Sequence, residues 1–120
     1  MLKLGWLDLL VNNAGVTRFE NILDLTPEVF DLLFHLDFKN YILMMQEAAR
    51  YMVKNKVRGS LINITSSRGE RAYAGDFLYG GLKAGLNRAI QSIALDLAPY
   101  GIRVNNVAPG AVRVRDKQEL

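Results

Sequence analysis

The sequence predicts an α/β fold built on a parallel sheet, because three short apolar runs alternate with two long stretches of helical periodicity. The apolar runs cover residues 6–11, 60–65 and 102–107, and the helices are expected over about 27–54 and 76–98. Two parallel strands need a long crossover between them, and a helix of this length provides one. The order strand, helix, strand, helix, strand therefore indicates one domain with a parallel sheet.

The ends of both expected helices carry recognisable signals. The first helix begins at Thr26-Pro27-Glu28, where threonine is a favoured N-cap, proline fits the first turn and an acid faces the positive helix end. This helix is apolar around most of its circumference, so part of its surface must be buried against something other than the sheet. The second helix is expected to end at Pro99-Tyr100-Gly101. The first strand is apolar on both faces except at Asp8, a pattern typical of a parallel strand covered by helices on both sides.

Composition narrows the class of protein. Half of the 120 residues are hydrophobic and 22% are charged, which is an ordinary balance for one globular domain with a modest core. The sequence has no cysteine and only one histidine, His35, which excludes disulfides and thiol catalysis and argues against a metal site. The apolar N-terminal segment is too short, and too soon interrupted by Asp8, to be a signal peptide or membrane span, so we expect a cytoplasmic location.

The central motif combines Ser66, Tyr79 and Lys83. Tyr79 and Lys83 lie four residues apart in the second expected helix, so their side chains share one helix face. An ammonium beside a phenol favours the phenolate and makes the phenol a usable acid or base nearer neutral pH. Ser66 stands at the carboxyl end of the second strand, and a loop can bring its hydroxyl back over the helix. Each element alone has an ordinary alternative, since a surface tyrosine can pack on a lysine stem and a serine after a strand can cap a helix.

Two further loops follow the other strands. Asn12-Asn13-Ala14-Gly15 follows the first strand, and Asn105-Asn106-Val107-Ala108-Pro109-Gly110 continues from the third. Small residues and amides just past a strand allow the backbone to approach a flat ligand closely, although they are also common in ordinary turns. Ligands of open α/β sheets bind at the carboxyl ends of the strands. All three loops are therefore expected at the ligand-binding edge of the sheet.

These motifs, in this order, resemble the short-chain dehydrogenase/reductase family over about residues 5–114. The resemblance implies a partial Rossmann-like, doubly wound parallel sheet equivalent to family strands 4-5-6, and a single partial domain over residues 1–120. It also implies an NAD(P)-dependent oxidoreductase that interconverts an alcohol and a ketone. By this resemblance Tyr79 exchanges the hydroxyl proton, Ser66 stabilises the substrate oxygen, and Lys83 assists Tyr79 and binds the nicotinamide ribose. The residues implied for binding NAD or NADP are Asn12, Ala14, Gly15, Tyr79, Lys83, Pro109, Gly110 and Val112.

The sequence also departs from the family pattern. Asp37 aligns with the asparagine that is the family's fourth catalytic residue. An acid there can still bend the helix and hold a water. The substitution leaves it undecided whether the family's proton relay from the lysine to solvent is kept. Val114 stands where the family often has a threonine. Nothing matches the family's glycine-rich turn for the cofactor pyrophosphate, so we expect the catalytic half of a dehydrogenase without that turn.

Alternatives from other classes remain open. In the resembled family the two long helices build a dimer interface, so a homodimer or homotetramer is expected here. A truncated, non-catalytic chain acting as a dimerisation or interaction module would retain the same motifs. A nucleic-acid-binding module rests only on the net charge of +3 and the pI of about 9.3, and the basic residues are spread out without interleaved aromatic residues. The sequence does not identify the alcohol or ketone, and it does not distinguish NAD from NADP.

Overall fold

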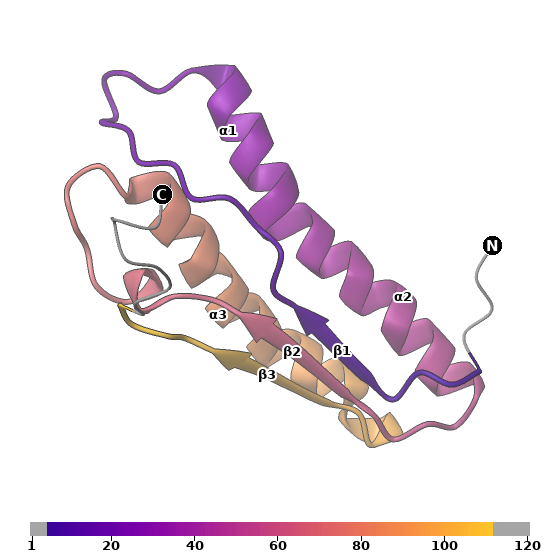
Figure 1. The fold of residues 1–120 in the computed structure, drawn as a ribbon. Coiled ribbons are helices and arrows are strands. Elements are labelled where there is room, and N and C mark those ends of the chain that lie inside the picture. The colour runs from indigo at the N-terminus through magenta and orange to yellow at the C-terminus, as the bar shows by residue number, and fades with distance from the viewer. Residues whose placement is uncertain (1–4, 112–120) are drawn as a thin grey trace, which may run out of the picture.

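The computed structural model describes residues 5–111 and shows a three-stranded parallel sheet with helices packed on it (Figure 1). The strand order is β1-β2-β3, with both pairs parallel. The elements in chain order are β1 (Leu9–Asn12), α1 (Pro27–Phe34), η1 (His35–Lys39), α2 (Asn40–Lys54), β2 (Ser60–Ile64), η2 (Ser67–Gly69), α3 (Phe77–Leu97), η3 (Ala98–Tyr100) and β3 (Arg103–Val107). The alternation of strands and helices around a parallel sheet confirms the predicted α/β class.

The first two helices and the segment between them form one continuous helical rod (Figure 1). The rod begins as predicted, because the Val29 amide donates to Thr26 Oγ1 at 3.3 Å and Pro27 occupies the first turn. It differs from the single predicted α-helix in its middle, where η1 is a π-helix. π-helical turns inside α-helices are frequent at functional sites, and this one contains Asp37.

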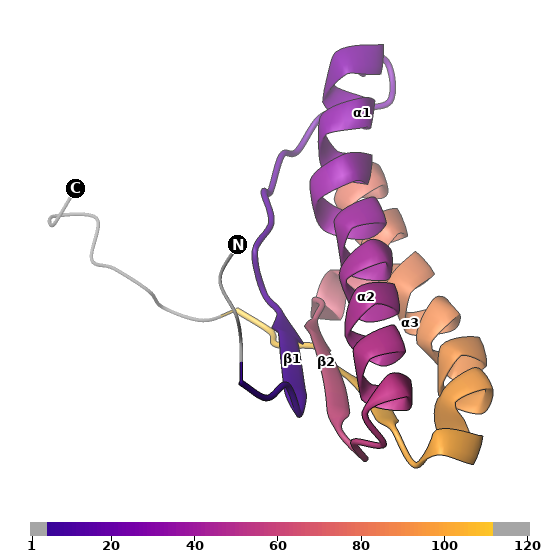
Figure 2. The same ribbon diagram turned by 90° about the vertical axis from the view of Figure 1, so that its right-hand side faces the viewer.

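Both long helical segments lie on the same face of the sheet (Figure 2). On that face Leu61 and Val104 are buried with α2 residues in the main hydrophobic core. On the opposite face of β1, Leu9 and Val11 are each 49% exposed. The prediction that helices cover the first strand on both sides is therefore wrong for residues 5–111. Two crossovers of the same hand that step in the same direction across a sheet place their helices on one face.

A row of asparagine side chains crosses the covered face of the sheet. Asn12, Asn63 and Asn106 stand opposite one another in the strand register. Asn12 Nδ2 donates to Asn63 Oδ1 at 2.9 Å, and Asn63 Nδ2 donates to Asn106 Oδ1 at 3.0 Å. Asn106 Nδ2 then donates to Asn87 Oδ1 of α3 at 3.0 Å. This asparagine row joins all three strands to α3 and satisfies amides that would be costly to bury unpaired.

The second crossover ends close to the predicted position. α3 runs to Leu97, the 3₁₀ turn η3 follows, and Gly101 adopts a left-handed backbone with φ of 69° that favours glycine. The chain then enters β3 one residue after the predicted start. Among the helices of residues 5–111, none combines the length and the apolar character needed to cross a membrane.

Candidate active site

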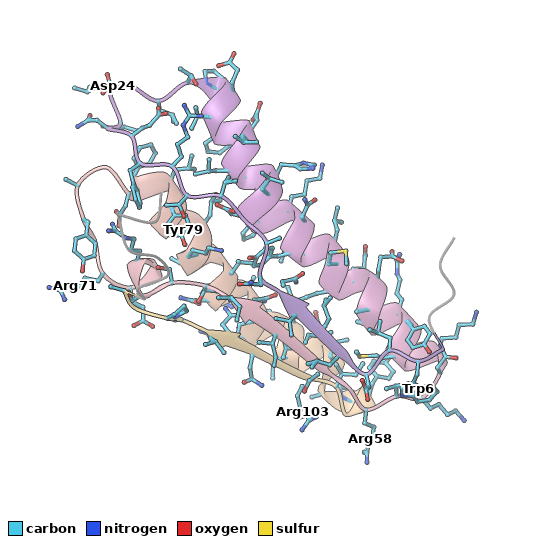
Figure 3. The ribbon with its side chains drawn as sticks, in the orientation of Figure 1. Trp6, Asp24, Arg58, Arg71, Tyr79 and Arg103 are labelled. Atoms are coloured by element: carbon cyan, nitrogen blue, oxygen red, sulfur yellow. The ribbon has the colours of Figure 1, made fainter. Side chains whose placement is uncertain are left out.

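A polar cavity of about 230 Å³ lies beyond the carboxyl ends of β1 and β2 and is bounded on one side by α3. It brings together five residues that the sequence singled out: Gly15, Asp37, Tyr79, Lys83 and Pro109. Figure 3 shows Tyr79 on α3, beside the chain segment that follows β1. The prediction that three loops meet at this edge of the sheet is confirmed, because the cavity lining comes from the loops after β1, β2 and β3.

Lys83 lines this cavity from α3. Its side chain is buried, and Nζ donates a hydrogen bond to the Ile64 carbonyl oxygen at 3.3 Å. The ammonium also lies 4.7 Å from the Tyr41 ring centroid and 5.6 Å from the Tyr79 ring centroid. Burial lowers the pKa of Lys83, and the nearby Asp37 carboxylate opposes that shift. Lys83 is thus a positioned cation that faces two phenol rings.

Asp37 is fully buried and connects the rod to the loop after β1. Its Oδ1 accepts a hydrogen bond from the Val16 amide at 2.9 Å. Burial raises the pKa of Asp37, while the Val16 hydrogen bond and Lys83 act in the opposite direction. A Cβ atom on Gly15 would lie only 2.6 Å from Asp37 Oδ1, so the loop approaches this closely only because residue 15 is glycine. Asp37 itself lies in the π-helical turn of the rod.

Tyr41 of α2 does not line this cavity, but its ring lies beside Lys83. Its side chain is buried, and its ring receives the Lys83 ammonium as a cation–π contact. Burial, the Asp37 charge and Tyr79 together raise the pKa of Tyr41 to about 12. The Tyr41 hydroxyl therefore keeps its proton at neutral pH.

Ser66 stands next to the cavity rather than in its lining. It is half-buried at the start of η2, where its Oγ accepts a hydrogen bond from the Arg68 amide at 3.1 Å. This is the helix-capping role that the sequence left open as the ordinary alternative. Because the oxygen acts as acceptor in that bond, the hydroxyl proton remains available to another acceptor.

The other predicted cofactor residues take different positions. Asn12 does not line the cavity, because its amide donates to the Tyr41 carbonyl oxygen at 3.1 Å and to Asn63 in the asparagine row. Ala14 lines an adjacent pocket at the edge of β1. Gly110 is exposed, with open space where a Cβ would stand. Val112 lies outside the described residues.

Sequence reasoning missed an aromatic cluster beside Tyr79. The Arg68 guanidinium contacts two rings, at 4.7 Å from the Phe19 centroid and 4.4 Å from the Tyr73 centroid. It also pairs with the buried Asp76 carboxylate at 3.1 Å. The Phe19 ring meets the Tyr79 ring edge-on, with 6.1 Å between centroids. These residues come from two loops and from α3, so no single sequence motif could have grouped them.

Comparison with known proteins agrees with this geometry. The family model described as short chain dehydrogenase matches residues 1–120. Carbonyl reductase [NADPH] 2 of Sus scrofa is 38% identical over 108 residues, which cover 90% of this chain and 44% of that protein. The crystal structure of acetoin dehydrogenase from Salmonella typhimurium superposes with a TM-score of 0.87 at 36% identity, covering 91% of this chain and 43% of that one.

A third similar protein is 4-hydroxyisoleucine dehydrogenase, whose structure was solved in complex with NADH. It has a TM-score of 0.85 at 26% identity and covers 88% of this chain and 47% of that one. The chain therefore spans about half the length of the relatives it matches. Since the family model covers the whole sequence and the motif loops meet at one cavity, the chain belongs to the short chain dehydrogenase family.

Proposed function

We propose that this chain carries the proton-transfer side of an NAD(P)-dependent oxidoreductase that interconverts a secondary alcohol and a ketone. One observation carries the proposal: Tyr79 and the buried Lys83 line the same cavity, with the Lys83 ammonium 5.6 Å from the Tyr79 ring centroid. A phenol with a fixed cation beside it is suited to general acid–base catalysis. The relatives whose names describe carbonyl reduction and acetoin oxidation support the same class of substrate.

The residues of the cavity fit a nicotinamide cofactor by their chemistry. Lys83 has three N–H donors and uses one of them on the Ile64 carbonyl oxygen, so the others suit ribose hydroxyls. Gly15 and Pro109 line the cavity and offer small or rigid surfaces for a flat ring. Ala14 and Gly110, outside that lining, and Val112 are further proposed contacts. The named relatives include one with NADPH and one solved with NADH, so both cofactors remain candidates.

The chemical step uses the proton of Tyr79. In the reducing direction the cofactor, when bound, supplies the hydride that the carbonyl carbon accepts. The Tyr79 hydroxyl donates its proton to the substrate oxygen, which completes the alcohol and leaves a phenolate on Tyr79. The Lys83 ammonium stabilises that phenolate, and the Ser66 hydroxyl donates a hydrogen bond to the substrate oxygen as charge develops on it. In the oxidising direction the Tyr79 phenolate takes the proton back.

An activity assay on matched tyrosine variants tests this assignment. NADH and NADPH oxidation are followed with acetoin as the probe ketone, and Tyr79→Phe is expected to lower kcat/KM by at least about 100-fold. Tyr73→Phe is the control, because Tyr73 lies outside the cavity lining and should keep the wild-type rate. Equal rates for wild type and Tyr79→Phe, or no oxidation above the protein-free rate, would contradict the proposal.

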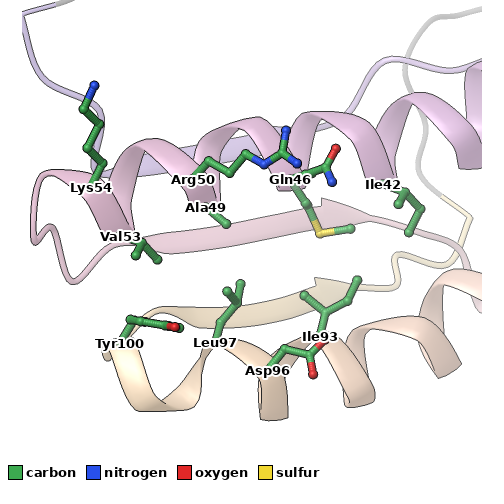
Figure 4. A pocket seen from close by; sticks show the side chains of 11 residues that line it. Ile42, Gln46, Ala49, Arg50, Val53, Lys54, Ile93, Asp96, Leu97 and Tyr100 are labelled. Atoms are coloured by element: carbon green, nitrogen blue, oxygen red, sulfur yellow. The ribbon is translucent and has the colours of Figure 1, made fainter.

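Self-association through α2 and α3 is a second proposed function, and it includes the case of a non-catalytic interaction module. A groove of about 540 Å³ runs between these helices (Figure 4). Its lining includes the apolar residues Ile42, Ala49, Val53, Ile93 and Leu97. A large apolar groove on two long helices suits a second copy of the same surface.

Sedimentation analysis tests this self-association. Wild type is expected to form a dimer or tetramer, and Ile93→Glu to shift the population to monomer because it places a charge in the groove. Leu23→Glu serves as the control, since Leu23 lies in the loop before α1 and is 89% exposed. A monomeric wild type at high protein concentration would exclude this role.

A cytoplasmic location also remains a prediction.

A further inference from the structure

Two buried polar side-chain atoms near Gly15, in the loop after β1, have no hydrogen-bond partner within residues 5–111. They are Asp37 Oδ2 and the Tyr41 hydroxyl. Both side chains are almost completely buried, at 0% and 3% exposure. An unpaired buried oxygen is costly, and a buried phenol normally donates to an acceptor. These two atoms therefore need an explanation that the sequence motifs do not supply.

The positions of the two groups bring them to the same place. Asp37 and Tyr41 are four residues apart along the rod, and both side chains are buried beneath the same loop. A Cβ on Gly15 would lie 2.6 Å from Asp37 Oδ1 and 3.7 Å from the Tyr41 hydroxyl oxygen. The carboxyl and the hydroxyl thus both face one glycine. The structure shows no bond between them, and a rotation of the carboxyl that turns Oδ2 toward the hydroxyl would join them.

The chemistry of the pair is complementary. The Tyr41 hydroxyl keeps its proton, because the pKa of Tyr41 is raised to about 12, so it is a donor. A carboxylate is an acceptor only, and its second oxygen has lone pairs that the Val16 amide does not use. We propose that Tyr41 is a positioning residue for this site: its hydroxyl donates a hydrogen bond to Asp37 Oδ2, which keeps that carboxylate charged and facing Lys83.

Within residues 5–111, few other groups lie close enough to Asp37 to donate a hydrogen bond to its Oδ2. From α3 it is faced by Lys83 and Tyr79, and from the loop after β1 by the Val16 backbone amide. His35 and Lys39 of its own turn are exposed. Burial favours the neutral acid, whereas Lys83 and the Val16 hydrogen bond favour the carboxylate. A second hydrogen bond, donated by Tyr41, further stabilises the charged carboxylate.

The inferred role in catalysis rests on the proposed function, because it matters only if Lys83 assists Tyr79. The hydrogen bond between Tyr41 and Asp37 does not depend on the proposed function, and it can be measured without cofactor or substrate. ¹³C NMR of the aspartate carboxyl carbons follows the titration of Asp37, which is assigned by the loss of its signal in Asp37→Asn. Tyr41→Phe keeps the ring beneath Lys83 and removes only the hydroxyl.

The titration of Asp37 in Tyr41→Phe shows whether Tyr41 donates a hydrogen bond to Asp37. If Tyr41 donates to Asp37, Tyr41→Phe raises the Asp37 midpoint by about one pH unit or more, because the charged form loses a donor. Tyr51→Phe, later on the same rod, leaves the midpoint unchanged. An unchanged midpoint in Tyr41→Phe would overturn the inference, whatever the cofactor and activity measurements show.

A second measurement needs no substitution at Tyr41. In the wild-type protein a buried, hydrogen-bonded Tyr41 hydroxyl proton is expected to give a resolved ¹H signal. That signal should shift with pH at the same midpoint as Asp37 and should move in Asp37→Asn. A Tyr41 hydroxyl proton that exchanges freely with water, or a signal that ignores the Asp37 titration, would equally overturn the inference.

Discussion

The Val16 amide donates a hydrogen bond to Asp37 Oδ1 at 2.9 Å and thereby attaches the loop after β1 to the π-helical turn of the rod. The attachment brings together two segments that lie 21 residues apart in the sequence. The contact depends on the absence of a side chain at Gly15, directly between the loop backbone and the carboxylate.

Gly15→Ala should disrupt this attachment. The added methyl would lie 2.6 Å from Asp37 Oδ1, so either the loop or the carboxylate must move. We expect a loss of about 1–3 kcal/mol in the free energy of unfolding, measured by urea denaturation. Gly5→Ala is the control, because nothing lies within 4 Å of its added Cβ. Equal stability of the two variants would show that the loop adapts without cost.

Asp37→Asn should make stability less dependent on pH. Burial raises the pKa of Asp37 above its ordinary value of 3.8, so the folded state binds this proton more tightly than the unfolded state does. The wild type therefore loses free energy of unfolding as pH rises from about that ordinary value through the raised pKa. Asparagine does not ionise, so Asp37→Asn does not lose free energy of unfolding in this pH range.

The measurement is urea denaturation of both proteins across a pH series. The stability of Asp37→Asn relative to wild type should grow with rising pH and level off once Asp37 is ionised. Asp31→Asn, on the exposed surface of α1, should show no such trend. A difference between wild type and Asp37→Asn that stays constant across the series would contradict the raised pKa.

The sequence predicted those parts of the site that depend on local geometry. Tyr79 and Lys83 face one cavity because residues four apart lie about one turn apart on the same helix face. Thr26 caps α1 through its own side chain. The strand order and the edge at which the loops meet follow from parallel β-α-β topology. The family membership predicted from five ordered motifs is confirmed by the match over residues 1–120.

The parts that were missed depend on contacts between distant segments. The apolar pattern of residues 27–54 is uniform, so nothing in it marked the π-helical turn at Asp37. The contact of the Tyr41 ring with Lys83 joins α2 to α3, and the Arg68 cluster joins two loops. The inward hydrogen bonds from the Asn12 amide to the Tyr41 carbonyl oxygen and to Asn63 were likewise not indicated by the sequence, and the role of Asn12 in cofactor binding stays a prediction.

The asparagine row should contribute strongly to stability. Asn63 lies at its centre with no exposed surface, and it bonds to both Asn12 and Asn106. Asn63→Leu keeps the volume but removes one hydrogen bond from each neighbour and leaves Asn106 Oδ1 without its donor, so we expect a loss of about 2–4 kcal/mol in the free energy of unfolding. Asn105→Leu, on the exposed side of β3, should change stability far less. Similar losses in the two variants would show that the asparagine row contributes no more to stability than an exposed asparagine does.

The adjacent glycines of α3 should respond in opposite directions. A Cβ on Gly80 would lie 2.7 Å from the Arg68 carbonyl oxygen, whereas nothing lies within 4 Å of a Cβ on Gly81. Gly80→Ala should therefore destabilise the protein by about 1–3 kcal/mol. Gly81→Ala should stabilise it by about 0.5–1 kcal/mol, because alanine favours the helix over glycine. Thermal unfolding of the pair tests both signs, and stabilisation by Gly80→Ala would contradict the close approach of η2 to α3.

The most direct test of the proposed function is calorimetric titration of NADH and then NADPH into the purified 120-residue chain. We predict micromolar binding of at least one cofactor, weakened roughly 10- to 100-fold in Lys83→Met because a charged hydrogen-bond donor is lost. Lys54→Met, exposed at the end of α2, should bind as the wild type does. No detectable heat up to millimolar cofactor, or equal affinity in Lys83→Met, would contradict a working cofactor site in this chain.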